Sequence, residues 1–148
     1  MTLTPPLPTD LDPVIRRLHR AWNDHDLDAV IACFHSDYES IHPCRPERGF
    51  RGQRGVRLCW GALLDSIPDF RADLRRCAAS GNTVWCEWRW EGTHVDGFPF
   101  ESVGVMIFDI EGDQIIRAHV YSEILQTDGP NWDSVLAALL EGETTRGH

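Results

Sequence analysis

The 148-residue sequence is poor in basic side chains, with 14 Lys and Arg against 23 Asp and Glu and a formal net charge of −9 at pH 7. Nucleic acids and anionic membrane surfaces are both recognised through Lys and Arg, so this balance argues against either partner. No apolar run approaches the roughly 20 residues of a membrane-spanning helix. The first ten residues, MTLTPPLPTD, also lack the basic and apolar regions of a signal peptide.

The five cysteines lack a recognisable pattern. Their number is odd and no CxxC pair occurs, whereas disulfide frameworks use even sets and zinc sites use closely spaced pairs. We therefore expect reduced thiols and a cytoplasmic protein. There is also no helical HxxxH motif, no nucleotide-binding loop and no nucleophile elbow. The sequence predicts neither a metal site nor a cofactor.

The spacing of apolar residues changes once along the chain. Helical spacing predicts helices that begin near Asp10 or Asp12, after Asp26, and at about residue 53, the last ending near 66. The segment DYESIHP alternates like a short strand. After Pro68 the period becomes two, which predicts strands at 70–79, 83–94, 100–110 and 114–126. A last helix is expected over residues 132–140.

This order of elements predicts an α+β fold. A strongly curved antiparallel sheet would wrap around the N-terminal helices and leave a cone, whose open end is a natural ligand pocket. We expect a flexible tail at residues 1–9, one domain at 10–127, and a C-terminal helix and tail at 128–148.

One segment, IIRAHVYSE at residues 115–123, alternates in an unusual way. One set of alternate residues is small or apolar, and the other contains His119, Tyr121 and Glu123. A strand with one buried face normally turns its polar set towards solvent. A histidine, a tyrosine and a glutamate on one face are also the groups that proton transfer requires. The segment alone leaves both orientations open.

Three segments resemble the SnoaL-like branch of the NTF2-like superfamily: AWNDHDLDAVIACFHSDYESIHP, WRWEGTHVDGFPFESVGVMIF and EGDQIIRAHVYSE. Together with the element order, the resemblance covers about residues 12–125. The superfamily includes ketosteroid isomerases, polyketide cyclases, limonene epoxide hydrolases and scytalone dehydratases. The resemblance implies the NTF2-like cone, with a small apolar or aromatic molecule as the ligand. It also implies that the last strand turns His119, Tyr121 and Glu123 into the cone.

The resemblance further implies an acid–base site. Glu123 falls where SnoaL-type cyclases and limonene epoxide hydrolases carry a functional aspartate. His42, directly before Pro43, falls where ketosteroid isomerases carry their general base, and a neutral histidine is a competent base near pH 7. We expect His42 or Glu123 to be the base, with Tyr121 and His119 as hydrogen-bond donors. The expected enzyme is a cofactor-independent isomerase, cyclase or dehydratase.

Alternatives remain at the level of function and of single residues. The donors of the ketosteroid isomerase oxyanion hole fall on Leu18 and near Met106, which cannot donate, so that activity itself is not expected. The chain could be a non-catalytic binding or dimeric assembly module, or an epoxide hydrolase in which Glu123 activates water. Glu123 could instead form an ion pair with Arg117 or another arginine, and His42 could serve only as a hydrogen-bonded strand end.

Aromatic residues provide candidates for a ligand wall and for an interface. The expected wall consists of Tyr38, Trp60, Trp88, Trp90, His94, Met106 and Phe108. Trp85 alternates with these on its strand and shares the opposite face with Glu87, Arg89 and Glu91. A tryptophan among charges on a sheet surface indicates that the surface is covered. We therefore expect a homodimer through the outer face of the sheet.

Overall fold

The computed structural model describes residues 7–8, 10–126 and 128–146, so most of the tail expected at residues 1–9 lies outside the described residues. The elements follow in the order α1 (Pro13–Asn23), α2 (Leu27–Ala32), β1 (Phe34–Ile41), η1 (Pro46–Arg48), β2 (Phe50–Arg51), α3 (Gln53–Ser66), β3 (Arg71–Ser80), β4 (Thr83–Thr93), β5 (Pro99–Glu111), β6 (Gln114–Ile124) and α4 (Trp132–Arg146). The expected order of helices and strands is confirmed. Two bounds differ by three residues or more: β1 already begins at Phe34, and α4 extends six residues further than predicted. The short strand β2 was not predicted.

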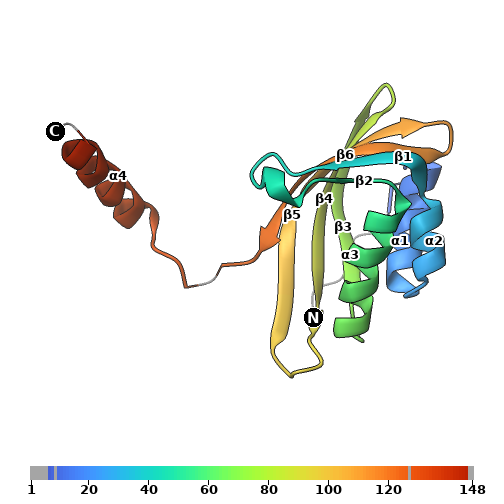
Figure 1. Ribbon diagram of the computed structural model, residues 1–148, viewed down its shortest axis with the longest axis horizontal. Coiled ribbons are helices and arrows are strands. Elements are labelled where there is room, and N and C mark those ends of the chain that lie inside the picture. The colour runs from blue at the N-terminus through green and yellow to red at the C-terminus, as the bar shows by residue number, and fades with distance from the viewer. Residues whose placement is uncertain (1–6, 9, 127, 147–148) are drawn as a thin grey trace.

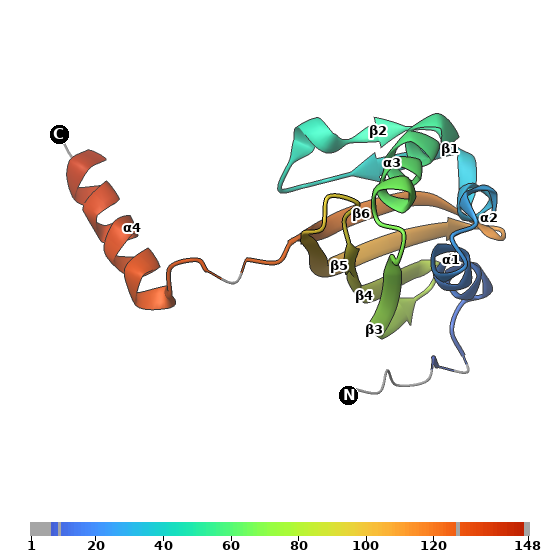
Figure 2. The same ribbon diagram turned by 90° about the horizontal axis from the view of Figure 1, so that it is seen from below.

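The strands form one six-stranded sheet in the order β2-β1-β6-β5-β4-β3. β1 pairs with β6 in parallel, and the other pairs are antiparallel. The sheet curves strongly and stays open, while α1, α2 and α3 gather on one side of it (Figure 1, and from below Figure 2). This arrangement confirms the predicted α+β cone.

Aspartates begin the first two helices as the sequence indicates. The carboxylate of Asp12 accepts a hydrogen bond from the Val14 amide at 3.0 Å, and that of Asp26 accepts one from the Ala29 amide at 3.1 Å. Each carboxylate satisfies an amide that the first helical turn leaves without an intrahelical partner. α1 then buries an apolar stripe that includes Trp22 against the sheet.

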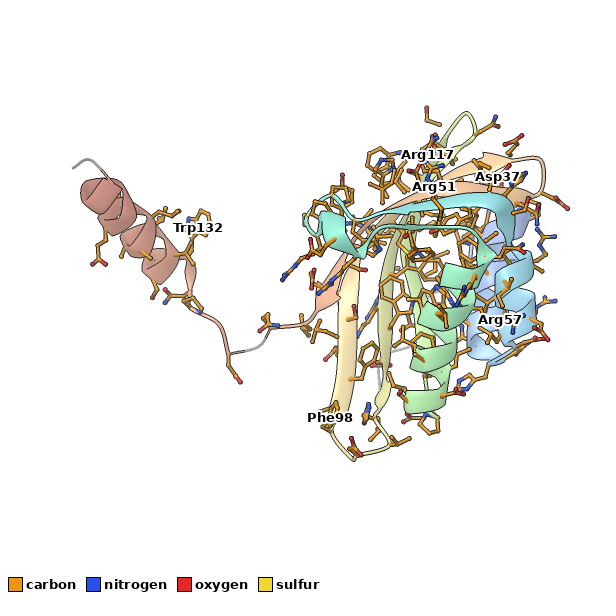
Figure 3. The ribbon with its side chains drawn as sticks, in the orientation of Figure 1. Asp37, Arg51, Arg57, Phe98, Arg117 and Trp132 are labelled. Carbon is orange, nitrogen blue, oxygen red and sulfur yellow. The ribbon has the colours of Figure 1, made fainter. Side chains whose placement is uncertain are left out.

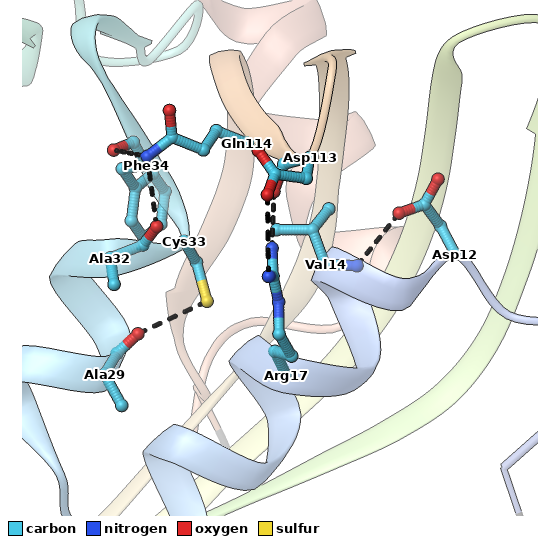
Figure 4. Close-up of polar contacts among 9 residues, drawn as sticks. All are labelled: Asp12, Val14, Arg17, Ala29, Ala32, Cys33, Phe34, Asp113 and Gln114. Atoms are coloured by element: carbon cyan, nitrogen blue, oxygen red, sulfur yellow. Dashed lines mark hydrogen bonds and ion pairs between the residues drawn. The ribbon is translucent and has the colours of Figure 1, made fainter.

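A group of polar contacts ties these helices to the turn between β5 and β6 (Figure 4). The Arg17 guanidinium donates to the main-chain oxygen of Asp113. The side-chain amide of Gln114 donates to the carbonyl oxygens of Ala32 and Phe34, at 3.2 Å each. These bonds hold the start of β1 beside the start of β6, two segments about 80 residues apart in the chain.

The core between helices and sheet is built around tryptophans. The ring centroid of Trp22 lies 4.5 Å from that of Trp60, 5.0 Å from that of Trp88 and 6.0 Å from that of Trp90. Tilted and edge-on contacts of this kind stabilise beyond the area that they bury. The cluster joins α1, α3 and β4, so it fixes the helices over the concave face of the sheet.

A β-bulge in β6 sets which residues face inward. Ile110 pairs with Ile115, but the preceding residue, Asp109, pairs with Arg117, which leaves Ile116 as an extra residue. Two consecutive residues opposite a single partner shift the alternation of a strand by one position. Ile115 and Ala118 are therefore both buried, although their separation is odd.

The last helix, α4, stands away from the rest of the molecule on the side where β6 ends (Figure 1). Seven residues, 125–131, connect it to β6. Trp132 at its start lies far from the sheet (Figure 3). Within the part of the chain that the structure describes, none of the helices combines the length and the apolar character needed to cross a membrane.

Candidate functional site

A cavity of about 140 Å³ lies between α3 and the concave face of the sheet. Its volume is close to the roughly 150 Å³ of an apolar cavity that accommodates benzene. Six of the fourteen residues that line it are aromatic, namely Tyr38, Phe50, Trp60, Phe70, Trp90 and Phe100. Among the described residues that line it, none is Asp, Glu, Lys or Arg. The cavity therefore fits an uncharged ligand, or part of one, about the size of a single ring.

The polar part of the wall comes mainly from β1 and the residue that follows it. Tyr38, Ser40 and His42 occupy alternate positions and so share one face of the extended chain. Ser40 Oγ lies 3.2 Å from His42 Nε2, and the Ser40 side chain also hydrogen-bonds with the Tyr38 hydroxyl. Because hydroxyls both donate and accept, the three groups form a continuous hydrogen-bonded series in the cavity wall.

The surroundings set the protonation states of this series. Burial lowers the pKa of His42, the Arg48 guanidinium lowers it further, and the Glu123 carboxylate opposes both. Burial also raises the pKa of Tyr38, against the smaller effect of its hydrogen bond with Ser40. At neutral pH the imidazole is therefore mostly neutral and the phenol stays protonated. A base and a hydrogen-bond donor therefore line the same cavity, with Ser40 between them.

β6 contributes other residues to the cavity than the resemblance implied. Val120 and Ser122 line the cavity, so the alternate residues His119, Tyr121 and Glu123 lie on the opposite face of the strand. Tyr121, for example, is 44% exposed. The expected inward orientation of these three residues is therefore wrong. The reason is the bulge at Ile116, which shifts the alternation between Ile115 and the rest of the strand.

Glu123 is held at the rim of the cavity by two arginines. Its Oε1 lies 3.4 Å from Arg45 Nε and 3.3 Å from Arg48 Nη1, and the side chain is about half exposed. This is the ion pair that the sequence left open as an alternative, although Arg117 is not its partner. Arg117 contacts Glu39 and Asp109 instead. Glu123 acts on His42 through its charge, from outside the cavity wall.

The other expected wall residues divide into two groups. Tyr38, Trp60, Trp90 and Met106 lie in the cavity wall. Trp88 and Phe108 do not line it and are fully buried elsewhere in the core. His94 lies beyond β4, where its ring stacks on Phe98 with centroids 4.3 Å apart and its Nδ1 lies 3.4 Å from Asp96. The expectation that these last three residues line the pocket is wrong.

Sequence reasoning missed the small residues of the site. Ser40, Ser102 and Ser122 each line the cavity, and Ser102 Oγ donates to the Glu123 carbonyl at 3.0 Å. Cys59 on α3 also lines the cavity. The residue as a whole is exposed, while burial around its sulfur raises the pKa of the thiol. Ser40 lies two residues before His42, so the alternation of a strand could have indicated that the two side chains share one face.

No three or more His, Cys, Asp or Glu side chains lie together in a way that could hold a metal ion, within residues 7–8, 10–126 and 128–146.

A family model described as the SnoaL-like domain matches residues 15–118. Three solved structures illustrate the fold. A protein from Catenulispora acidiphila with a ketosteroid isomerase-like fold, in complex with trimethylamine, is 13% identical (TM-score 0.61; 74% of this chain and 84% of that chain covered). Wild-type IdmH from Streptomyces antibioticus, a proposed polyketide cyclase, is 21% identical (TM-score 0.64; 74% and 89% covered). An NTF2-like protein of unknown function from Burkholderia pseudomallei is 17% identical (TM-score 0.61; 74% and 88% covered). No curated protein matches the chain.

Proposed function

The chain belongs to the SnoaL-like domain family, and within that family we propose that it binds a small, uncharged, mostly apolar molecule and acts on it by acid–base chemistry without a cofactor. The observation that carries this proposal is the hydrogen-bonded series Tyr38, Ser40 and His42 in the wall of an otherwise apolar cavity. Such a cavity with a few convergent polar groups is the usual form of a small-molecule site.

In this proposal His42 is the general base. When the ligand binds, the Ser40 hydroxyl turns its hydrogen from Nε2 to the Tyr38 oxygen, which frees the Nε2 lone pair and leaves the Tyr38 O–H available to donate. Nε2 then takes a proton from a carbon next to a carbonyl group, and the electrons of the broken C–H bond move onto the carbonyl oxygen. The Tyr38 hydroxyl, kept protonated by burial, donates a hydrogen bond to that oxygen. The Glu123 carboxylate stabilises the imidazolium from the rim. Return of the proton to a different carbon gives isomerisation, and return to a departing hydroxyl gives dehydration.

The experiment follows exchange of the protons next to the carbonyl of cyclohexenone in D₂O by NMR. We expect His42→Gln to slow protein-catalysed exchange by about 10²–10⁴-fold, the usual contribution of a general base. His119→Gln is the matched control, because His119 lies on the opposite face of the sheet, and it should leave the rate within about twofold. If His42→Gln retains the wild-type rate, His42 is not the base. If the wild type gives no exchange although it binds the ketone, the cavity serves binding alone.

We also propose that two copies associate through the outer face of the sheet. Trp85 on β4 is 50% exposed and lies in register with Ile107 on β5, while Val105 on β5 pairs with Tyr121 on β6. Ion pairs such as Arg76 with Glu87, at 3.2 Å, border this apolar strip. An apolar centre with a charged border is the usual composition of a protein interface.

Sedimentation analysis checks this association. Trp85→Glu introduces a charge at the centre of the strip and should convert dimers into monomers at micromolar concentration. Leu58→Glu, on the exposed side of α3, is the control and should leave the dimer intact. A wild-type protein that sediments as a monomer would exclude the proposed dimer.

A further inference from the structure

The helix α4 has an apolar stripe that faces solvent. Trp132, Leu136 and Leu139 follow one another at spacings of four and three residues, which places them on one side of the helix. Trp132 is 70% exposed and Leu139 is 59% exposed. An isolated helix of about this length is only marginally stable in water. The stripe is therefore the part of α4 that requires a surface to pack on.

The connection to α4 starts at the rim of the cavity. Ser122 lines the cavity, Ile124 ends β6, and the Leu125 amide donates to the Glu101 carbonyl at 2.9 Å. The seven residues between β6 and α4 span at most about 25 Å when fully extended. Such a short tether keeps α4 at a high effective concentration near this rim. From the end of β6 the connection runs away from the sheet towards α4 (Figures 1 and 2).

The rim complements α4 in both polarity and charge. Ile124 is 50% exposed and Leu125 is exposed as well, so apolar surface is present where the tether starts. Arg45 and Arg48 lie close to Ile124, because both contact Glu123, the residue directly before it. The basic segment to which they belong, residues 44–57, has five arginines and one glutamate. The tether and the first turn of α4 contribute Asp128 and Asp133.

We propose that α4 closes over the cavity mouth of its own chain. Its apolar stripe packs on Ile124 and Leu125, and Asp133 approaches Arg45 and Arg48. Closure completes the wall of the cavity and excludes water from His42, which strengthens the electrostatic interactions inside. This role rests on the proposed function, because a lid serves a cavity that holds a ligand. The test below uses no ligand, so its failure leaves the acid–base proposal standing.

Cys59 is a built-in reporter of closure, because it lines the cavity and is exposed while α4 stands away. The experiment measures its alkylation by N-ethylmaleimide in the full chain, with mass spectrometry assigning each cysteine. Leu139→Glu places a charge in the stripe. Ala137→Glu places the same charge on the opposite side of the helix, as the spacing of 3.6 residues per turn requires. Alkylation of Cys77 on β3 reports any general loosening of the fold.

We expect Leu139→Glu to accelerate alkylation of Cys59 at least about tenfold, since an open form populated to 10% or less protects the thiol by that factor. Ala137→Glu should match the wild type, and the rate at Cys77 should stay constant in both variants. Equal Cys59 rates in the two variants would overturn the proposal. The protection should also be independent of protein concentration. Protection that disappears on dilution would assign the contact to a second copy and overturn closure within one chain.

Discussion

The paired strands β1 and β6 contain the same kinds of polar residue but turn most of them to opposite faces. With His42, the residue after β1, counted with that strand, each contributes a histidine, a tyrosine and a glutamate. In β1 and the residue after it, Tyr38 and His42 turn into the cavity and Glu39 faces outward, where it pairs with Arg51 and Arg117. In β6 the histidine, tyrosine and glutamate all face outward. Residue types alone therefore do not decide which face of a strand turns into the cavity. The register in which the strand pairs with its neighbours decides it.

A large side chain on the inner face of β6 should fill the cavity. Ser122→Phe should place a ring inside the cavity and weaken binding of a neutral single-ring ligand such as phenol by more than about 100-fold, because the ring occupies the space of the ligand. Tyr121→Phe changes the adjacent residue on the outer face and should keep the dissociation constant within about twofold. Titration calorimetry measures both. Equal losses in the two variants would contradict the assignment of faces.

A second prediction concerns the close contact of β5 with β6. A Cβ atom on Gly104 would lie 2.3 Å from the Ser122 Cα, so Gly104→Ala forces the two backbones apart. We expect a loss of about 2–4 kcal/mol in the free energy of unfolding. In Gly61→Ala the new atom meets only the flexible Leu27 side chain at 3.3 Å, within α3. That change should range from neutral to about 1 kcal/mol stabilising. Urea unfolding compares the two variants, and similar losses in both would show that the contact is not tight.

A third prediction concerns the pH dependence of the proposed activity, because Glu123 on β6 affects the pKa of His42 next to β1. In the proposed mechanism activity requires neutral His42, so activity should decline as the pH falls through the pKa of this residue, which burial places below its ordinary value. Glu123→Gln removes the group that raises this pKa and should move the acid limb to lower pH. Arg48→Met removes a group that lowers it and should move the limb to higher pH. Shifts in the same direction would show that the rim charges do not act on His42.

Most of the fold could be predicted because its signals are local. Asp12 and Asp26 cap the first two helices, and alternation located the four strands after Pro68 to within about two residues. The phase of β6 was missed because the bulge at Ile116 has no glycine or proline to indicate it in the sequence. The partners of Glu123 were missed for a different reason. Arg45 and Arg48 approach it across more than 70 residues of chain, through the parallel pairing of β1 with β6.

That parallel pairing also determines when the site can form during folding. β1 pairs with β6, so Glu39 meets Arg117 only after the chain between them has been synthesised and arranged. Contacts of such long sequence separation form slowly, because the loop between the two segments must close first. The helices and the β3–β4–β5 meander can assemble earlier from neighbouring segments. During synthesis His42 is therefore among the first site residues to leave the ribosome. The cavity wall around it is complete only after residues 114–124 have been synthesised and have paired with β1.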